Sequence, residues 1–260
     1  MKGTGRQGDK LTYKNKEQKV ENYLFHVCSL FFALVWFSYI MLHAIVPVKH
    51  LERAKMRLSS VLSPAERRVL VLAMLGDVLY ALRATPAVEH VSVISRDSTV
   101  LHAAAQHGAE AIVDRMNGLN EALTQAATHV AARGAGALLV LPADVPLVSP
   151  NNINELVAML GHAPSAVLAA SRDGGTNALL VRPPLALPFL YGANSLARHM
   201  AAARLCGMGI KIVRSPGLML DVDQPDDLTL LAEAAGNTAA QQFVRTSHGV
   251  RHAWCAIGNA

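Results

Sequence analysis

The apolar residues of this chain follow two different spacings from residue 43 onward, and these predict alternating strands and helices. Short aliphatic runs typical of buried strands occupy residues 43–48, 90–95, 109–113, 136–144, 165–171, 176–182, 210–215 and 217–223. The longer segments between them start at residues that favour helix N-termini, namely Ser63-Pro64, Asp97, Ser149-Pro150, Ser195 and Pro225. This alternation predicts an α/β fold, a single domain with a doubly wound and mainly parallel sheet. We expect the domain to span residues 43–235, with a loosely ordered tail over 236–260.

The first 42 residues do not continue this pattern. A Lys-rich arm precedes an apolar segment, residues 23–42, which has no charged residue and the length of ~20 residues that crosses a bilayer. Two points argue against a span: the first strand follows without a spacer, and the basic arm would stay cytoplasmic and send the domain outward. We therefore prefer a chain start at Met41, with residues 1–40 an upstream over-read, and exclude them from the fold. A membrane anchor and an additional buried or interfacial helix remain as alternatives.

Charge and cysteine content exclude several classes of protein. The chain has a net charge of +5, but residues 43–235 contain sixteen basic and sixteen acidic side chains, so the excess lies at the two ends. The sequence therefore carries no basic stripe for a nucleic acid. Cys28, Cys206 and Cys255 are isolated, which argues against a disulfide framework or a zinc site and fits a reducing compartment. We expect a cytoplasmic protein without a nucleic-acid partner.

Acidic residues follow two of the predicted strands. Asp144 stands between two prolines after an apolar run, and Asp221 and Asp223 end the last predicted strand. Ligands of open α/β sheets bind beyond the carboxyl ends of the strands, and a spacing of two points Asp221 and Asp223 to the same side. Three carboxylates at neighbouring strand ends would repel one another without a cation, and oxygen ligands of this kind suit Mg²⁺. The alternative is that each aspartate only caps a helix or turn.

A basic loop follows the first predicted strand and opens onto the same edge of the sheet. Its positive charges can hold a triphosphate, and they belong to Lys49, Arg53, Lys55 and Arg57. The loop has neither the GxxxxGK pattern of a P-loop nor the GxGxxG pattern of a dinucleotide site. The alternative is a solvated basic loop without a ligand.

The order of motifs along the chain resembles one family of nucleotidyltransferases. The motifs lie between residues 43 and 235 and read IVPVK with AKMRL, then LPAD, GGTNALL, YGANS and LDVDQPDDL. Together they are similar to the 2-phospholactate, phosphoenolpyruvate and 3-phosphoglycerate guanylyltransferases of coenzyme F420 biosynthesis. The resemblance implies a nucleotidyltransferase (GT-A-like) fold. It also implies an Mg²⁺-dependent transfer of GMP from GTP to the phosphate of a three-carbon phospho-acid, with release of pyrophosphate.

The resemblance further implies roles for individual residues. The metal ligands would be Asp144, Asp221 and Asp223, with Lys49 as a further catalytic residue. The carboxylate and phosphate of the acid would be bound by Thr176, Asn177, Gly192 and Ser195. The GTP phosphates would be cradled by Lys49, Lys55 and Arg57, and the nucleoside approached by Asn117, Gly118 and Asn120. The YGANS motif departs from the FGPGS-like wording of many members, which leaves the lining of the acceptor pocket open.

Three questions stay open on the sequence alone. The first is the acceptor, since 2-phospholactate, phosphoenolpyruvate and 3-phosphoglycerate differ only by a methyl, a double bond or a displaced phosphate. The second is the function, whose alternatives are a molybdopterin guanylyltransferase, a sugar-acid cytidylyltransferase, a glycosyltransferase with Asp221-Val-Asp223 as its DxD motif, or a membrane-tethered nucleotide sensor without turnover. The third is the oligomeric state, for which an exposed sheet edge makes a homodimer reasonable.

Overall fold

The computed structural model describes residues 41–247. The predicted basic arm and nearly all of the predicted apolar segment lie outside the described residues, as does the predicted tail beyond residue 247. Between residues 41 and 247, no helix combines the length and the apolar character needed to cross a bilayer.

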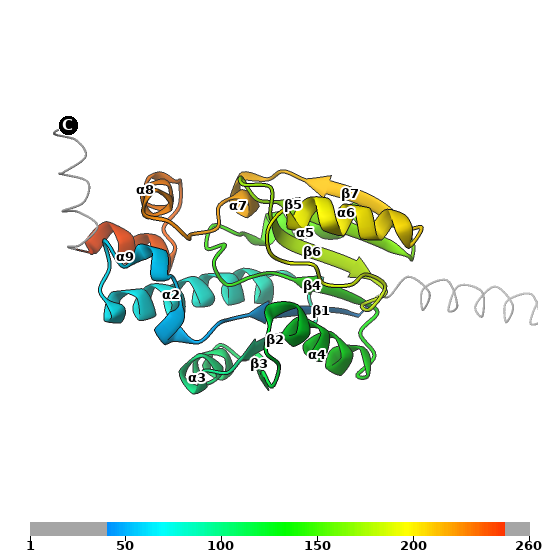
Figure 1. Cartoon of the computed structure of the whole chain (residues 1–260), viewed down its shortest axis with the longest axis horizontal. Coiled ribbons are helices and arrows are strands. Elements are labelled where there is room, and N and C mark those ends of the chain that lie inside the picture. Colours follow the sequence, from blue (N-terminus) through cyan, green and yellow to red (C-terminus); the bar gives the residue numbers. More distant parts are fainter. Residues whose placement is uncertain (1–40, 248–260) are drawn as a thin grey trace, which may run out of the picture. The chain divides into compact units, whose positions relative to one another are not determined.

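Seven strands form one sheet in the order β3-β2-β1-β4-β6-β5-β7 (Figure 1). Their bounds are β1 Leu42–Pro47, β2 His90–Ser95, β3 Glu110–Val113, β4 Ala137–Val140, β5 Ser165–Ala170, β6 Thr176–Arg182 and β7 Gly209–Val213. β6 runs antiparallel to both of its neighbours, β4 and β5, whereas the other neighbouring strands are parallel. The predicted α/β domain with a mainly parallel sheet is therefore confirmed, and β6 makes the sheet a mixed one.

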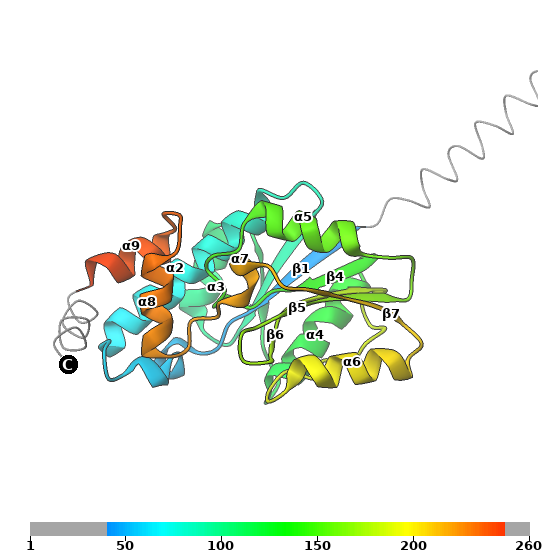
Figure 2. The same cartoon turned by 90° about the horizontal axis from the view of Figure 1, so that it is seen from above.

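Helices cover both faces of this sheet. Their bounds are η1 Leu51–Arg53, η2 Met56–Leu58, α2 Pro64–Arg83, α3 Ser98–Gln106, α4 Leu119–Ala131, α5 Pro150–Met159, α6 Ser195–Leu205, α7 Pro216–Met219, α8 Pro225–Glu233 and α9 Ala239–Thr246. α4 and α6 lie on one face of the sheet, and α2 and α5 lie on the other (Figure 2). This is the doubly wound arrangement that the alternating pattern predicts.

The helix starts follow from local chemistry. The Ser63 hydroxyl accepts a hydrogen bond from the Glu66 N–H, and the Glu66 carboxylate accepts one from the Ser63 N–H, which is a capping box. Ser149 starts α5 in the same way, and Asp97 caps α3 by accepting from the Thr99 N–H. Asp97 also accepts the Leu51 N–H, 3.0 Å away, so the same carboxylate holds η1 in place after β1.

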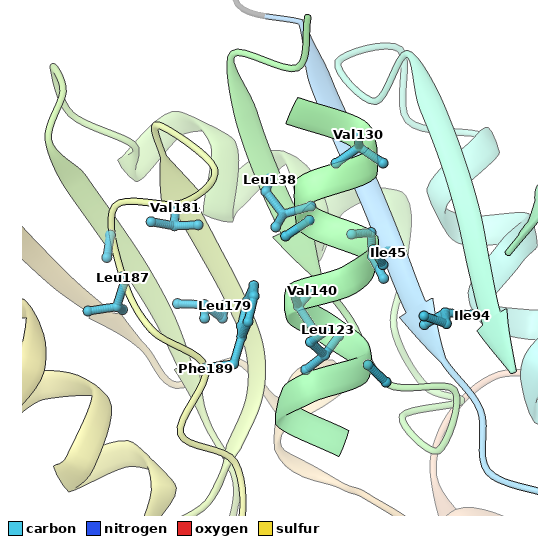
Figure 3. Packing of buried hydrophobic residues seen from close by; sticks show 14 of the residues in the cluster. Ile45, Ile94, Leu123, Val130, Leu138, Val140, Leu179, Val181, Leu187 and Phe189 are labelled. Atoms are coloured by element: carbon cyan, nitrogen blue, oxygen red, sulfur yellow. The ribbon is translucent and has the colours of Figure 1, made fainter. Parts of the chain in front are cut away.

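The core on one face forms between the sheet and α4. Leu123 and Val130 of α4 lie over the side chains that β1 and β4 present, among them Ile45 and Leu138 (Figure 3). Both helix residues are fully buried. Burial of a Leu or Val side chain contributes about 1.5–3 kcal/mol to the stability of the fold. The packed core therefore gives the loops at the strand ends a rigid support.

The reversed direction of β6 decides which residues meet beyond the sheet. The parallel strands end at one edge, and β6 starts at this edge with Thr176 and Asn177. Val140, the last residue of β4, pairs with Leu179 of β6. The loop that leaves β4 toward Asp144 therefore runs beside the start of β6.

Three predicted features differ from the structure. Residues 217–223 form no strand: α7 begins at Pro216, and the chain from Leu220 to Asp223 is neither helix nor strand. Proline at the first helical position favours this helical turn, which packs closely enough that a Cβ on Gly217 would lie 2.8 Å from the Leu147 carbonyl oxygen. The tail predicted from residue 236 contains α9, which packs on α2 and α8. β4 also ends earlier than predicted, because Pro142 has no N–H to donate to a neighbour.

Candidate active site

One large cavity, of about 730 Å³, opens at the carboxyl edge of the sheet. Residues that follow β1, β2, β3, β4 and β5 line it, together with the start of β6. It is lined by nearly all of the predicted site residues: Lys49, Lys55, Arg57, Asn117, Gly118, Asp144, Thr176, Asn177, Gly192, Ser195, Asp221 and Asp223. The prediction that these distant segments meet at one edge thus agrees with the structure, whereas the roles of the individual residues remain predictions.

A lysine stands between two of the acidic residues. The Lys55 Nζ atom lies 2.6 Å from Asp144 Oδ2 and 2.6 Å from Asp223 Oδ1, so it donates a charge-assisted hydrogen bond to each. Lys55 has the left-handed backbone conformation, with φ at 52°, between η1 and η2. This conformation is uncommon for a residue other than glycine, and here it turns the side chain from the basic loop toward the acids.

Burial and neighbouring charges shift the pKa values of Lys55 and Asp223 in opposite directions. Burial lowers the pKa of the Lys55 ammonium, but the attraction of Asp144 and Asp223 outweighs it and raises the pKa above its ordinary value. Burial likewise raises the pKa of Asp223, and Lys55 outweighs this effect, so that the pKa of Asp223 is lowered. Lys55 and Asp223 are therefore both charged near neutral pH.

The third acid has a different environment. The Asp221 Oδ1 atom accepts a hydrogen bond of 3.2 Å from the Asn177 amide, whose nitrogen also donates to the Leu218 carbonyl. Burial first, and then repulsion by Asp144, raise the pKa of Asp221. The prediction that Asp221 and Asp223 share one strand face is wrong, since their segment is not a strand. A single hydrogen bond, from the Val222 N–H to the Asp144 carbonyl at 3.0 Å, joins this segment to the β4 loop.

These acids suit Mg²⁺ in their chemistry, but they do not form a complete cage. Within the described residues, no group of three or more acidic, histidine or cysteine side chains is arranged to hold a metal ion. Lys55 uses only one oxygen of Asp144 and one of Asp223, and these side chains are 30% and 44% exposed. Mg²⁺ in phosphoryl-transfer enzymes is typically bound by one or two carboxylates and completed by water and substrate phosphates. The residues present therefore fit Mg²⁺ that arrives with a phosphorylated substrate.

The other basic residues of the loop after β1 stay at the surface of the cavity. Lys49 is exposed, and the Arg57 side chain is 72% exposed with its Nη1 atom 3.9 Å from Asp223 Oδ2. They can reach the phosphates of a ligand without first leaving a tight ion pair. Lys55 differs from Lys49 and Arg57, because its ammonium already contacts the two aspartates.

The opposite wall presents hydroxyl groups from β6 and α6. Thr176 Oγ1 lies 3.2 Å from Ser195 Oγ, and both residues are buried at the cavity lining. Gly192, with φ at 122°, allows the chain to turn into the start of α6. The predicted helix start at Ser195 is confirmed by α6. Hydroxyl groups beside a helix N-terminus are suited to bind an anion.

His199, for which the sequence predicts no role, is fully buried behind this wall. Its Nδ1 atom lies 3.1 Å from Thr176 Oγ1, and its Nε2 atom lies 2.9 Å from the Leu190 N–H donor. The spacing between Ser195 and His199, one turn of α6, is the signal that could have indicated contact with the same site.

One of the residues predicted to approach the nucleoside, Asn120, lies elsewhere in the structure. Asn120 does not line the cavity; its amide pairs with the Tyr191 backbone, accepting from the N–H at 2.8 Å and donating to the carbonyl at 3.2 Å. It therefore holds the loop before Gly192. Asn117 accepts a hydrogen bond from Arg96, which also pairs with Asp114 at 3.4 Å, and all three line the cavity.

Comparison with solved structures supports the fold. A cytidylyltransferase from Leptospira borgpetersenii matches with a TM-score of 0.54 and 10% identity, over 85% of this chain and 98% of that chain. The CMP:2-keto-3-deoxy-manno-octonic acid synthetase in complex with CTP matches with a TM-score of 0.51 and 13% identity, over 74% of this chain and 96% of that chain. At these identities the likeness concerns the nucleotidyltransferase fold alone, which confirms the fold predicted from the motifs.

Comparison of sequences is more specific. A phosphoenolpyruvate guanylyltransferase of Roseiflexus sp. (strain RS-1) is 45% identical over 205 residues, which cover 79% of this chain and 91% of the relative. A 3-phospho-D-glycerate guanylyltransferase of Colwellia psychrerythraea is 32% identical over 188 residues, 72% of this chain and 90% of the relative. The family described as "Guanylyl transferase CofC like" matches residues 42–250. The chain therefore belongs to the CofC-like guanylyl transferase family, as its motifs predict.

Proposed function

We propose that this guanylyltransferase transfers GMP from GTP to the phosphate of phosphoenolpyruvate and releases pyrophosphate. The observation that carries the proposal is the cavity in which the Lys55-bridged pair of Asp144 and Asp223 faces the hydroxyl groups of Thr176 and Ser195. One wall suits the phosphates of a nucleotide with Mg²⁺, and the other suits a small anionic acid. The product would enter the biosynthesis of coenzyme F420.

The reaction needs alignment more than acid–base chemistry. The phosphate of the acceptor is the nucleophile, and it is largely dianionic near neutral pH because its second pKa is about 6. An oxygen of this phosphate attacks the α-phosphorus of GTP, a P–O bond forms, and the bond to the leaving pyrophosphate breaks. The protein must hold both substrates in line and offset the negative charge that they bring together.

The cavity offers residues for each of these tasks. Lys49 and Arg57 would bind the β- and γ-phosphates of GTP, since their side chains are exposed at the basic loop. The Thr176 hydroxyl would bind an anionic group of the acid, and Ser195 would support it through its hydrogen bond to Thr176 Oγ1. Mg²⁺ bound by Asp144 and Asp223, when present, would supply positive charge beside the phosphates.

Lys55 would act through the two aspartates. It would keep Asp144 and Asp223 close together in spite of their like charge, since the two aspartates raise its pKa and favour the protonated form. Asp221, whose pKa is raised, would contribute to the metal site mainly when a cation is bound nearby.

Phosphoenolpyruvate is our first choice of acceptor because the relatives that share 42–45% identity with the chain carry its name. 3-Phosphoglycerate is the second candidate, supported by the relative from Colwellia psychrerythraea. 2-Phospholactate, the third acid implied by the motifs, belongs in the same comparison.

The test is a direct measurement of product. The purified chain is incubated with GTP, Mg²⁺ and each of the three acids in turn, and pyrophosphate and the guanylylated acid are measured, the latter by mass spectrometry. We expect product with phosphoenolpyruvate in preference to the other acids, and none with CTP in place of GTP. Pyrophosphate without a guanylylated acid, or a preference for another acid, would refute the proposal.

A further inference from the structure

His199 lies behind the acceptor wall and connects two parts of the chain. It belongs to α6, has no exposed surface, and contacts Thr176 of β6 and the backbone of Leu190. The Tyr191 ring packs edge-on against the imidazole, with 5.1 Å between the ring centroids. The imidazole is therefore held on two sides and shielded from water.

The contacts of His199 determine which ring nitrogen carries the hydrogen. The Leu190 N–H can only donate, so the Nε2 atom that faces it at 2.9 Å must accept and cannot carry a hydrogen. A neutral imidazole then carries its hydrogen on Nδ1. The charged form would place a second N–H against the Leu190 N–H, and burial lowers the pKa of His199 to about 4, so the ring is neutral near pH 7.

This assignment determines the role of the Thr176 hydroxyl. The hydrogen on His199 Nδ1 faces Thr176 Oγ1 over 3.1 Å, and the ring also bonds the Ser195 backbone, so the hydroxyl oxygen shares this hydrogen as an acceptor. Ser195 Oγ donates to the same oxygen over 3.2 Å. A hydroxyl oxygen has two lone pairs and one hydrogen. With both lone pairs occupied by donors, Thr176 has only its O–H to offer, and Thr176 lines the cavity.

We propose that His199 is a positioning residue for the acceptor: it fills a lone pair of Thr176 Oγ1 so that the Thr176 O–H is directed as a hydrogen-bond donor to the anionic group of the phospho-acid. The inference rests on the proposed function, because it assigns the acid to the Thr176 side of the cavity. A donor that is already oriented loses little entropy on binding, and it discriminates in favour of an anion over a neutral group.

Two substitutions separate the two nitrogens of His199. His199→Asn places an amide N–H at the distance from Cβ at which Nδ1 lies, so it retains the donor to Thr176. His199→Gln places an amide oxygen near the position of Nε2, so it retains an acceptor for the Leu190 N–H and loses the donor to Thr176. If His199 were only structural, both variants would affect the two substrates alike.

We expect the His199→Gln variant to raise the KM for the acid roughly 10- to 100-fold, the loss of a hydrogen bond to a charged group, with the KM for GTP nearly unchanged. We expect His199→Asn to restore the KM for the acid to within a few-fold of the original. Equal effects of the two variants, or a rise only in the KM for GTP, would overturn the inference.

A double-mutant cycle with Thr176→Val tests whether His199 acts through the hydroxyl. In the Thr176→Val background there is no O–H to direct, so we expect His199→Gln to add no further rise in the KM for the acid. Additive effects would show that His199 acts on the acid by another route and would overturn the inference. Thermal unfolding of each variant reports any general loss of structure.

The unsubstituted protein provides a measurement that does not depend on how the variants fold. ¹⁵N NMR of the histidine rings is expected to show His199 neutral near pH 7 with its hydrogen on Nδ1, and a hydrogen on Nε2 would overturn the inference. If the unsubstituted protein forms no guanylylated acid, the proposed function fails and this inference fails with it. If it forms product while the cycle is additive, only the role of His199 is refuted.

Discussion

Replacing Lys55 by methionine tests the pairing that organises the acidic side of the site. Methionine is similar in length and apolar, so it keeps the packing of the buried stem and removes the ammonium. The variant then leaves Asp144 and Asp223 side by side without the cation that each contacts at 2.6 Å. Both a stability and an activity effect are expected.

The size of the stability effect follows from the exposure of the three groups. Removing one partner of a fully buried pair costs about 3–5 kcal/mol. Here Lys55 is 9% exposed, but Asp144 and Asp223 are 30% and 44% exposed, so water can solvate them once the lysine is gone. The burial of the ammonium, which is itself unfavourable, is also relieved. We expect a loss of about 1–2 kcal/mol, a fall in Tm of roughly 2–8 °C for a domain of this size.

The stability difference should depend on pH in a defined direction. The pKa of Asp223 is lowered from 3.8 in the folded state, so the stabilisation by its charged form is complete above pH 3.8 and lost as the pH falls through the folded value. The pKa of Lys55 is raised from 10.5, so its contribution is complete below pH 10.5 and lost only above it. The difference in unfolding free energy between the unsubstituted protein and the Lys55→Met variant should thus be constant near neutral pH and become smaller in strong acid.

The assays are urea unfolding at several pH values and steady-state turnover. We expect kcat to fall by roughly 100-fold, as when one preorganised electrostatic group is removed from an active site. Lys49→Met is the matched control for stability, because Lys49 is exposed and forms no hydrogen bond or salt bridge within the described part of the chain. Unchanged turnover in the Lys55 variant, or an equal loss of stability in the Lys49 variant, would refute the reasoning.

Three further substitutions test other parts of the site. Asp144→Asn should abolish nearly all turnover while circular dichroism and Tm show an intact fold; turnover within about threefold of the original would reject its assignment. Ser195→Ala should raise the KM for the acid about tenfold and leave the KM for GTP unchanged, since its hydroxyl lies beside Thr176; a rise only for GTP would mean that the two subsites are exchanged. Asn120→Ala should destabilise the protein by about 1–3 kcal/mol in urea unfolding, because the N–H and carbonyl of Tyr191 lose their partners; an unchanged stability would show that water replaces the amide.

Local chemistry made much of the fold predictable. The caps at Ser63, Asp97 and Ser149 depend on residues only two or three positions away, and the structure has each of them. The strands were predicted from aliphatic runs that need no partner to be recognised. The convergence of Asp144 with the basic loop after β1 could be anticipated from one topological rule, because the loops at the carboxyl ends of parallel strands share an edge.

What escaped prediction depends on contacts between distant residues. Lys55 was assigned to phosphates because its charge is visible in the sequence, whereas its partners lie 89 and 168 positions away. α9 lies in the segment expected to be a tail, and its start depends on a distant partner: the Asp77 carboxylate of α2 accepts its first N–H groups at 2.8 and 2.9 Å. The run at 217–223 looked like a strand because aliphatic composition alone does not distinguish a strand from a short helix followed by an irregular segment.

The sequence separation of the Lys55–Asp223 contact has a consequence for synthesis in the cell. Lys55 leaves the ribosome early, but its second partner follows 168 positions later. A nascent chain that stops before Asp223 contains Asp144 but lacks the second aspartate that Lys55 contacts. A complete Lys55-bridged pair therefore forms only after Asp223 has been synthesised, and fragments truncated before Asp223 should not refold into a working site.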